Sequence, residues 1–478
     1  MPELLTPDIC VIGGGAGGLA VATRARAYGA TVVLIEKGKP GGEPTSSGAL
    51  AAAALAGAAR RANNMRTAAA FGIANDEPKI NARGVFEHVR GILDATAPET
   101  ATERLTALGV EVIAAEGRFA DRQTVVAGGQ LIQARRFVIA TGGRPHVPEI
   151  EGLAGVPFFT SVSILDNPRK LTHLVVVGAG PEGLALAQAY RRLGSEVTVV
   201  EGATPLAESD PELGEIALRR LAEEGVVVRS STRVVRVQQR SLGIGVTIRS
   251  GEAEEVLDAS HILIASGSLP ELDGLDLDKA GIRRKKGDPS RLELQGNLKT
   301  TNARVYAIGD AGGGLRHAHV ARYQAELVVE NIVLGLPVRN NPLRVPAIVF
   351  TDPEIAEIGL AEPEARRRHG KNYQVLRYSL AENHRARAER QGYGLVKLVA
   401  DRRGRLLGAG IVGANAAEMI ALFGFAIGNR MSVDNFRNLV APYPTLAEIA
   451  HDIADEAVRS KAASRLHAWL MALRHLLP

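Results

Sequence analysis

Two glycine-rich turns, each set between an apolar strand and a helix, constrain this chain more than any other feature of its sequence. The first turn follows an apolar run at residues 8–12 and reads Gly-Gly-Gly-Ala-Gly-Gly over residues 13–18. A helical pattern at 19–28 and a second apolar strand at 31–35 come next, so the predicted order is strand, turn, helix, strand. In a G-x-G-x-x-G turn, the first glycine permits the sharp bend and the second lets backbone N–H groups approach a pyrophosphate. The third lets helix and strand pack closely. These glycines are Gly13, Gly15 and Gly18.

The same unit recurs later in the chain. An apolar run at 174–177 precedes a second turn, and a strand at 197–200 follows the helix. Both units end in an acidic residue, Glu36 in the first and Glu201 in the second, where a carboxylate can accept hydrogen bonds from ribose hydroxyls. One such pattern is weak, but two in full context predict two dinucleotide sites rather than two tight turns. The glycines of the second turn are Gly178, Gly180 and Gly183.

Composition excludes several classes of function. The chain has 478 residues, of which 46% are hydrophobic and 23% charged, as in ordinary globular proteins. It has no apolar run of about 18 residues and no secretory pattern at its start, so we expect a cytoplasmic protein. A net charge of +5 and an aromatic content of 4% do not favour a nucleic-acid partner. The single cysteine, Cys10, excludes both an intramolecular disulfide and a cysteine-based zinc site, and we expect no metal site.

Three further segments complete the nucleotide-binding pattern. Residues 137–145 and 262–270 are similar strand-to-turn units, each expected to close one nucleotide domain. Residues 305–310 form a strand that ends in Gly-Asp. The Asp310 carboxylate can accept a hydrogen bond from a polyol such as the ribityl chain of a flavin.

The pattern changes from about residue 341. Apolar segments predict antiparallel strands and then two helices, with no further glycine turn. This predicts an α+β module with strands at 345–350, 394–400 and 406–412 and helices at 416–429 and 432–439.

These motifs together resemble the pyridine nucleotide–disulfide oxidoreductase family, in its dihydrolipoamide dehydrogenase and mercuric reductase branch. The resemblance is most specific at residues 140–145, 307–310, 345–354 and 443–448. It implies an α/β fold with two Rossmann-like domains, for FAD and NAD, and a C-terminal α+β dimerisation domain in a homodimer. The implied division is an FAD domain at 1–150 and 273–344, an NAD(P) domain at 151–272, a dimerisation domain at 345–458 and a helical tail at 459–478.

The resemblance also implies the residues that hold each cofactor. Because Glu201 suits a free ribose hydroxyl and the next three residues are neither Arg nor Lys, NADH is favoured over NADPH. The nicotinamide nucleotide would contact Gly178, Gly180, Gly183, Glu201 and Gly267. FAD would contact Gly13, Gly15, Gly18, Glu36, Lys37, Gly42, Gly117, Thr141, Gly142, Asp310, Ala318 and His319.

The chain departs from the family at its redox centre. The two positions aligned with the family's redox-active cysteines hold Pro44 and Ala49, which form no thiolate. The family's flavin-facing Lys and its acidic partner align with Ala53 and Ala185. Losing one of these charges alone would leave the other buried and uncompensated, whereas losing both is internally consistent.

A second departure lies near the C-terminus. Disulfide-reducing members use a His before Pro-Thr, oriented by a Glu; here the position is Tyr443, while Glu448 remains. A phenol has a free pKa of about 10 against about 6.5 for imidazole, so it is no ready base at pH 7. Tyr443 either donates a hydrogen bond to a reduced oxygen or is a plain interface tyrosine. Glu448 either anchors Tyr443 or caps local backbone.

Without a disulfide, electrons must leave the flavin directly. The sequence therefore predicts an FAD-dependent NAD(P)H oxidoreductase with a small non-disulfide acceptor, namely a quinone, dye, metal ion or dioxygen. The alternative is a flavoprotein subunit without turnover that binds a partner or senses NADH. The residues expected at the acceptor site are Ala49, Ser46, Tyr443 and Glu448.

The tail at 459–478 predicts an amphipathic helix with basic residues largely off its apolar face. We expect this face to pack on the dimer or the core; the alternative is peripheral contact with the inner face of a membrane. The apolar face comprises Leu466, Trp469, Leu470, Leu473 and Leu477.

Overall fold

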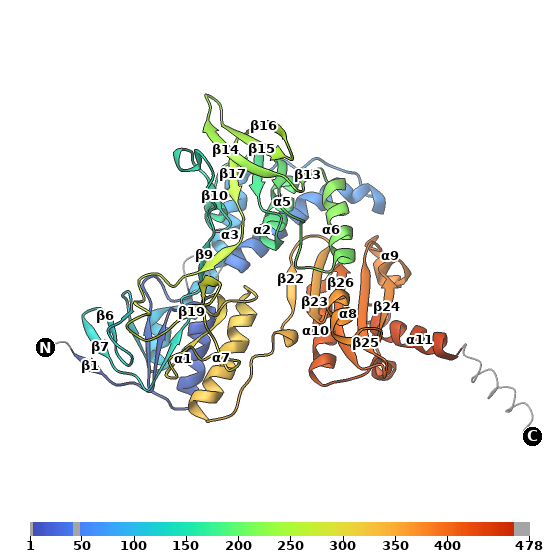
Figure 1. The fold of residues 1–478 in the computed structure, drawn as a ribbon. Helices are drawn as coiled ribbons and strands as arrows, with labels where there is room; N and C mark the ends of the chain where they lie inside the picture. Colours follow the sequence, from blue (N-terminus) through green and yellow to red (C-terminus); the bar gives the residue numbers. More distant parts are fainter. Residues whose placement is uncertain (1–2, 42–47, 463–478) are drawn as a thin grey trace, which may run out of the picture. The chain divides into compact units, whose positions relative to one another are not determined.

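The computed structural model describes residues 3–41 and 48–462, with side chains described as far as residue 459 (Figure 1). Gly42, Pro44, Ser46 and the tail from 463 onward lie outside the described residues. Contacts within the chain define two compact units, and the three-part division expected from the sequence stays a prediction. The first unit comprises Met1–Gly178, Ala189–Gly202 and Ser231–Asn340; the second comprises Ala179–Gln188, Ala203–Ser230 and Asn341–Pro478.

A five-stranded parallel sheet in the order β21-β8-β2-β3-β4 forms the centre of the first unit. Its strands β2 and β3 are buried along their whole length, as expected for a parallel sheet covered on both faces. Helices α1 (Ala16–Ala27) and α7 (Ala318–Val333) lie side by side (Figure 1). The strands are β2 (Ile9–Ile12), β3 (Val32–Ile35), β4 (Val110–Ile113), β8 (Arg136–Ile139) and β21 (Val305–Ala307).

A second parallel sheet repeats this arrangement, with strands in the order β10-β17-β11-β12. Helix α5 (Pro181–Arg192) joins β11 to β12, so the second strand–turn–helix–strand prediction is confirmed. An antiparallel sheet, β14-β15-β16, precedes β17. The strands are β10 (Phe159–Thr160), β11 (His173–Val177), β12 (Glu196–Val200), β14 (Arg233–Gln239), β15 (Ile244–Ser250), β16 (Ala253–Ala259) and β17 (His261–Ile264).

The remaining elements of the first unit are three helices and several short strands. The alanine-rich segment predicted as a helix lies within α2 (Gly48–Thr67), which is followed by α3 (Ala82–Thr96) and α4 (Thr102–Ala107). The short strands form the pairs β9–β18 and β19–β20 and a sheet in the order β1-β7-β6-β5. They are β1 (Leu4–Leu5), β5 (Arg118–Phe119), β6 (Val125–Ala127), β7 (Gln130–Ile132), β9 (Gly143–Pro145), β18 (Ser268–Pro270), β19 (Arg284–Lys285) and β20 (Asp288–Leu292).

The second unit contains a five-stranded antiparallel sheet in the order β22-β23-β26-β25-β24. Strands were predicted at the positions of β22, β25 and β26, whereas β23 and β24 were missed. The strands are β22 (Ala347–Val349), β23 (Glu354–Gly359), β24 (Tyr373–Ser379), β25 (Leu395–Asp401) and β26 (Leu406–Gly413). The other elements are α6 (Pro211–Glu223), β13 (Val226–Arg229), α8 (Glu362–His369), α9 (His384–Ala388), α10 (Ala416–Gly428) and α11 (Glu448–Ala462).

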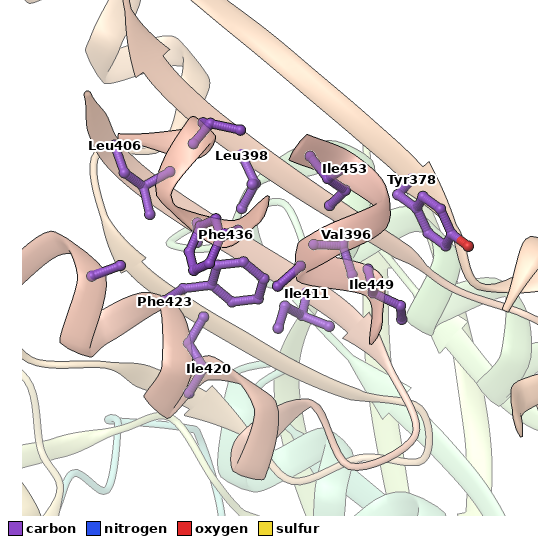
Figure 2. Packing of buried hydrophobic residues seen from close by; sticks show 14 of the residues in the cluster. Tyr378, Val396, Leu398, Leu406, Ile411, Ile420, Phe423, Phe436, Ile449 and Ile453 are labelled. Atoms are coloured by element: carbon purple, nitrogen blue, oxygen red, sulfur yellow. The ribbon is translucent and has the colours of Figure 1, made fainter. Parts of the chain in front are cut away.

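Helix α10 packs against this sheet and confirms the helix predicted at 416–429. The helix predicted at 432–439 is instead a 3₁₀ helix at Val433–Asn438, since so short a segment favours the tighter turn. It still carries a core residue: the rings of Phe423 and Phe436 meet edge to face with centroids 5.5 Å apart (Figure 2).

A buried lysine fastens α6 to the sheet of the second unit. The Nζ atom of Lys397, whose side chain is 5% exposed, lies 2.8 Å from Asp210, 2.9 Å from Glu212 and 2.8 Å from Glu362. Burial alone would lower the pKa of this ammonium group, but its hydrogen bonds to the three carboxylates outweigh burial and raise that pKa. The Asp210 carboxylate also caps α6 by accepting from the Glu212 backbone N–H. The buried Lys397, together with the partly exposed Arg377 that contacts Glu212 and Glu362, compensates the three acids at this junction.

We expect Lys397→Met to destabilise the protein by about 3–5 kcal/mol, because the carboxylates would remain packed without their cation. Urea unfolding followed by circular dichroism measures the loss. The matched control is Arg377→Met, which removes a guanidinium that is 43% exposed and paired with Glu212, and should cost about 1 kcal/mol or less. Equal losses for the two variants would contradict this account.

Candidate functional site

At the carboxyl edge of the sheet, the backbone of the first glycine turn lies in close contact with the backbone that follows β8. Gly13 has φ +103°, and a Cβ there would overlap the carbonyl oxygen of Ala140 at the end of β8. A Cβ on Gly18 would overlap the carbonyl oxygen of Gly13. The Gly13 N–H donates to the Ile35 carbonyl at 2.8 Å. The start of α1 is thereby fixed where β2, β3 and β8 end.

Gly15 differs from these two glycines because the space beside it is open. It is the N-cap of α1, no described side chain caps that helix, and no acidic residue lies in its first turn. A Cβ on Gly15 would meet no described atom within 4 Å. Uncapped N–H groups at a helix start attract anions, so the turn fits the pyrophosphate of a dinucleotide.

Glu36 is held beside this turn by the backbone. Its carboxylate accepts hydrogen bonds from the N–H groups of Gly14 and Gly38. The acid therefore stands next to the turn, where the ribose contact was predicted. Lys37, which follows it, is exposed.

Other predicted flavin residues gather at the same edge of the sheet. The Thr141 hydroxyl donates to the Glu271 carbonyl at 2.6 Å, and Gly142 follows at the end of β8. A Cβ on Gly143 would lie 3.2 Å from the Asp310 carboxylate, which follows β21. A Cβ on Gly117 would lie 3.2 Å from the side chain of Ile35. Ligands of open α/β sheets bind outside the carboxyl ends of the strands, so this is the expected place.

The start of α7 adds two stacked imidazoles. The rings of His317 and His319 are 5.0 Å apart and nearly parallel, on either side of Ala318. Burial, and then the neighbouring His319, lower the pKa of His317 to about 4. His317 is therefore a neutral imidazole at pH 7. A Cβ on Gly267 would lie 3.0 Å from the Arg316 guanidinium.

The second glycine turn repeats the geometry of the first. Gly178 has φ +110°, and a Cβ there would overlap the carbonyl oxygen of Ala265, as Gly13 would overlap Ala140. Gly180, like Gly15, has no described atom within 4 Å of its missing Cβ. Gly183 lies in the first turn of α5.

The side chain of Arg233, about 30 positions later in the sequence, lies beside Gly202, the residue that follows Glu201. A Cβ on the next residue, Gly202, would lie 3.2 Å from Arg233 Cγ and 3.4 Å from its Nε. Arg233 begins β14, and the preceding Thr232 N–H donates to the Glu201 carbonyl at 2.9 Å. The expectation of no basic residue here was read from residues 202–204 alone, so it missed Arg233.

Comparison with known proteins identifies the family. Residues 7–325 match the family described as "Pyridine nucleotide-disulphide oxidoreductase", and residues 345–454 match its dimerisation domain. The chain belongs to this family. A mercuric reductase of Streptomyces lividans is 31% identical, covering 92% of this chain and 94% of that protein. A dihydrolipoyl dehydrogenase of Geobacillus stearothermophilus is also 31% identical, covering 94% and 96%.

Solved structures agree on the fold. The HOCl-induced flavoprotein disulfide reductase RclA from Escherichia coli superposes with a TM-score of 0.82 at 24% identity, covering 94% of this chain and 99% of that one. The predicted fold class is therefore confirmed: two Rossmann-like nucleotide domains and a C-terminal dimerisation domain, which supports a homodimer. Family members are oxidoreductases that use FAD and NAD(P)H.

The centre of this family member contains no accessible thiol. Cys10 lies in β2 with 0% of its surface exposed, and burial raises the pKa of its thiol. Ala49 and Ala53 are exposed residues on α2, while Pro44 and Ser46 lie outside the described residues. In the described parts of the chain, no helix is long and apolar enough to cross a membrane, and no three or more His, Cys, Asp or Glu side chains form a metal-binding group.

Near the C-terminus the structure separates the two residues that the sequence paired. Tyr443 is 72% exposed, and its hydroxyl lies 3.3 Å from Nδ1 of His384, a residue that sequence reasoning missed. Glu448 begins α11 and accepts a 2.9 Å hydrogen bond from the Thr445 backbone N–H. Of the two roles considered for Glu448, the structure shows the backbone cap.

We expect Gly15→Ala to weaken FAD binding by about tenfold or more without unfolding the protein. Its φ of −75° suits any residue, but the added methyl group would occupy the space in front of the α1 N–H groups. Fluorescence titration of the apoprotein with FAD measures the affinity. Gly57→Ala, in α2 with equally open space, is the matched control and should bind FAD normally. Equal affinities in both variants would exclude the turn as the FAD site.

We expect Glu201→Ala to lower the NADH to NADPH ratio of kcat/KM about tenfold, because removal of a carboxylate removes its repulsion of a 2′-phosphate. Steady-state rates with both cofactors measure the ratio. Arg233→Ala is the companion variant and should raise the ratio, since it removes the guanidinium beside Gly202 that could pair with a 2′-phosphate. A wild-type enzyme that prefers NADPH tenfold would overturn the assignment of NADH.

Proposed function

We propose that this protein is an NADH-dependent FAD oxidoreductase that passes electrons directly from reduced flavin to a small, non-disulfide acceptor. One observation carries the proposal: Cys10, the only cysteine of the sequence, is fully buried in β2. A buried thiol with a raised pKa is neither a nucleophile nor a partner in thiol–disulfide exchange. In this proposal, electrons pass from the reduced flavin directly to the acceptor, instead of through the cysteine pair that other family members use.

The chain's own residues bind and orient rather than react. Bound FAD would supply the redox chemistry, accepting a hydride from nicotinamide and releasing two electrons. The open space at Gly15 and the acid Glu36 suit its pyrophosphate and ribose, and Asp310 suits its ribityl chain. The corresponding second turn, with Glu201, suits NADH.

The acceptor side is supported by small or neutral groups. Ala49 replaces a cysteine with a side chain that leaves more room, and we place the acceptor beside Ala49 and Ser46, with Tyr443 supplied by the partner subunit of the homodimer. The Tyr443 phenol is exposed and can donate a hydrogen bond to the oxygen of a reduced acceptor. A quinone, a dye, a metal ion or dioxygen fits such a site. Peripheral membrane contact through 459–478 stays a prediction.

We expect NADH to bleach the bound flavin in anaerobic stopped flow at two electrons per FAD, and benzoquinone to reoxidise it rapidly. Lipoamide and glutathione disulfide should leave the flavin reduced, because no thiol can relay electrons to them. Failure of NADH to bleach the flavin would refute the proposal. Bleaching without reoxidation by any acceptor would instead favour an NADH-sensing subunit.

The matched variant is Cys10→Ala, which leaves the chain without sulfhydryl groups. We expect its benzoquinone turnover to stay within about twofold of wild type. A loss of turnover in a variant that still folds and binds FAD would show that the thiol participates.

A further inference from the structure

We propose that His384 is the positioning and proton-supplying partner of the Tyr443 hydroxyl, so that the two residues act as one proton donor to the acceptor. This inference rests on the proposed function, which places Tyr443 at the acceptor site. The two residues are 59 positions apart, and their side chains meet only through the fold.

The geometry of the pair is well defined. The Tyr443 Oη atom lies 3.3 Å from His384 Nδ1, within reach of a hydrogen bond. The two rings stand edge to face, with centroids 5.8 Å apart and planes at 89°. In the single chain both residues are exposed, so neither ring is enclosed by its own subunit.

A buried amide holds the two residues together. Asn383, which precedes His384, is 2% exposed. Its side-chain NH₂ donates to the Thr445 carbonyl at 3.0 Å, and its carbonyl oxygen accepts from the Ala386 N–H at 3.0 Å. One side chain therefore links the start of α9 to the turn that carries Tyr443.

The turn is also fixed from its other side. The Glu448 carboxylate accepts from the Thr445 N–H, and the Thr445 hydroxyl donates to the Pro442 carbonyl at 2.7 Å. Glu448 is thus engaged with backbone, and the polar contact of the phenol is with His384. The Asn383 side chain is buried, while the two rings are exposed.

The proposed proton transfer needs a second group that returns a proton to the Tyr443 phenol. Reduction of a quinone to a quinol by hydride transfer requires one further proton at the second oxygen. In the proposed step the Tyr443 O–H bond breaks as the acceptor O–H bond forms. The proton on Nδ1 of His384 then passes to Tyr443 Oη, as water supplies a proton to Nε2 of the same ring. Two electrons arrive as the hydride and one proton is drawn from solvent, so the step balances.

The test uses the FAD-loaded dimer reduced with NADH and two oxidants. Benzoquinone takes up protons when it is reduced, whereas ferricyanide accepts single electrons and takes up none. His384→Gln keeps hydrogen-bonding capacity but cannot cycle a proton, and Tyr443→Phe removes the hydroxyl. We expect each variant to slow flavin reoxidation by benzoquinone about tenfold, with a much smaller effect on ferricyanide. The double variant should be no slower than either single variant, since the residues act as a unit.

A spectroscopic measurement tests the contact without turnover. In protein labelled with ¹⁵N-histidine, the His384 signal is the one that disappears in His384→Gln. Its Nδ1 shift should change in Tyr443→Phe and stay constant in the control His88→Gln, an exposed histidine on α3. The control should also retain the benzoquinone rate.

The outcomes separate this inference from the proposed function. Suppose that benzoquinone reoxidises the wild-type flavin. If His384→Gln is reoxidised at the same rate, or if the Nδ1 chemical shift of His384 is unchanged in Tyr443→Phe, the inference about the pair is wrong and the proposed function stands. If wild type is not reoxidised by benzoquinone or any other small acceptor, both are overturned.

Discussion

Backbone contact between each glycine turn and the neighbouring strand is the constraint on which the nucleotide sites depend. At Gly13 and Gly178 a single Cβ would overlap a carbonyl oxygen, of Ala140 and Ala265 respectively. Only glycine allows this approach, and the approach sets the helix start at the carboxyl edge of the sheet. Because the next turn glycine, Gly15, leaves open space, the uncapped N–H groups of α1 remain available to an anion. The position of Asp310 beside Gly143 follows from the same strand alignment.

The sequence predicted those parts of the fold that are determined by residues close together in the chain. Each turn, its strands and the acid that follows them lie within about 30 consecutive residues, the span of a βαβ motif, so the sequence alone was enough. Strand β24 was missed because most of its residues are half-buried and it lacks a long apolar run. Arg233 and His384 were missed for a different reason: each reaches the site by pairing with a segment far along the chain. No spacing in the sequence marks either residue.

The pattern of losses in this chain is coherent in physical terms. A buried charge is costly without its partner, and the aligned Lys and acid are both alanine here. By contrast, the Lys397 side chain is 5% exposed and keeps three carboxylate partners. The chain therefore retains buried charge where it fastens α6 to the sheet and lacks it where a disulfide would have operated. The remaining thiol, that of Cys10, is fully buried in β2, and burial raises its pKa.

Replacing an imidazole by a phenol changes what a proton donor needs around it. Free phenol and imidazolium differ by about 3.5 pKa units, or about 5 kcal/mol, so a phenol that gives up its proton must be resupplied at once. An imidazole within hydrogen-bond reach meets that need without restoring the original residue. The Asn383 side chain keeps the two rings close to each other, because its amide hydrogen-bonds to the backbone beside both of them. In the proposed step, proton donation therefore involves two rings that are held together by one buried side chain, that of Asn383.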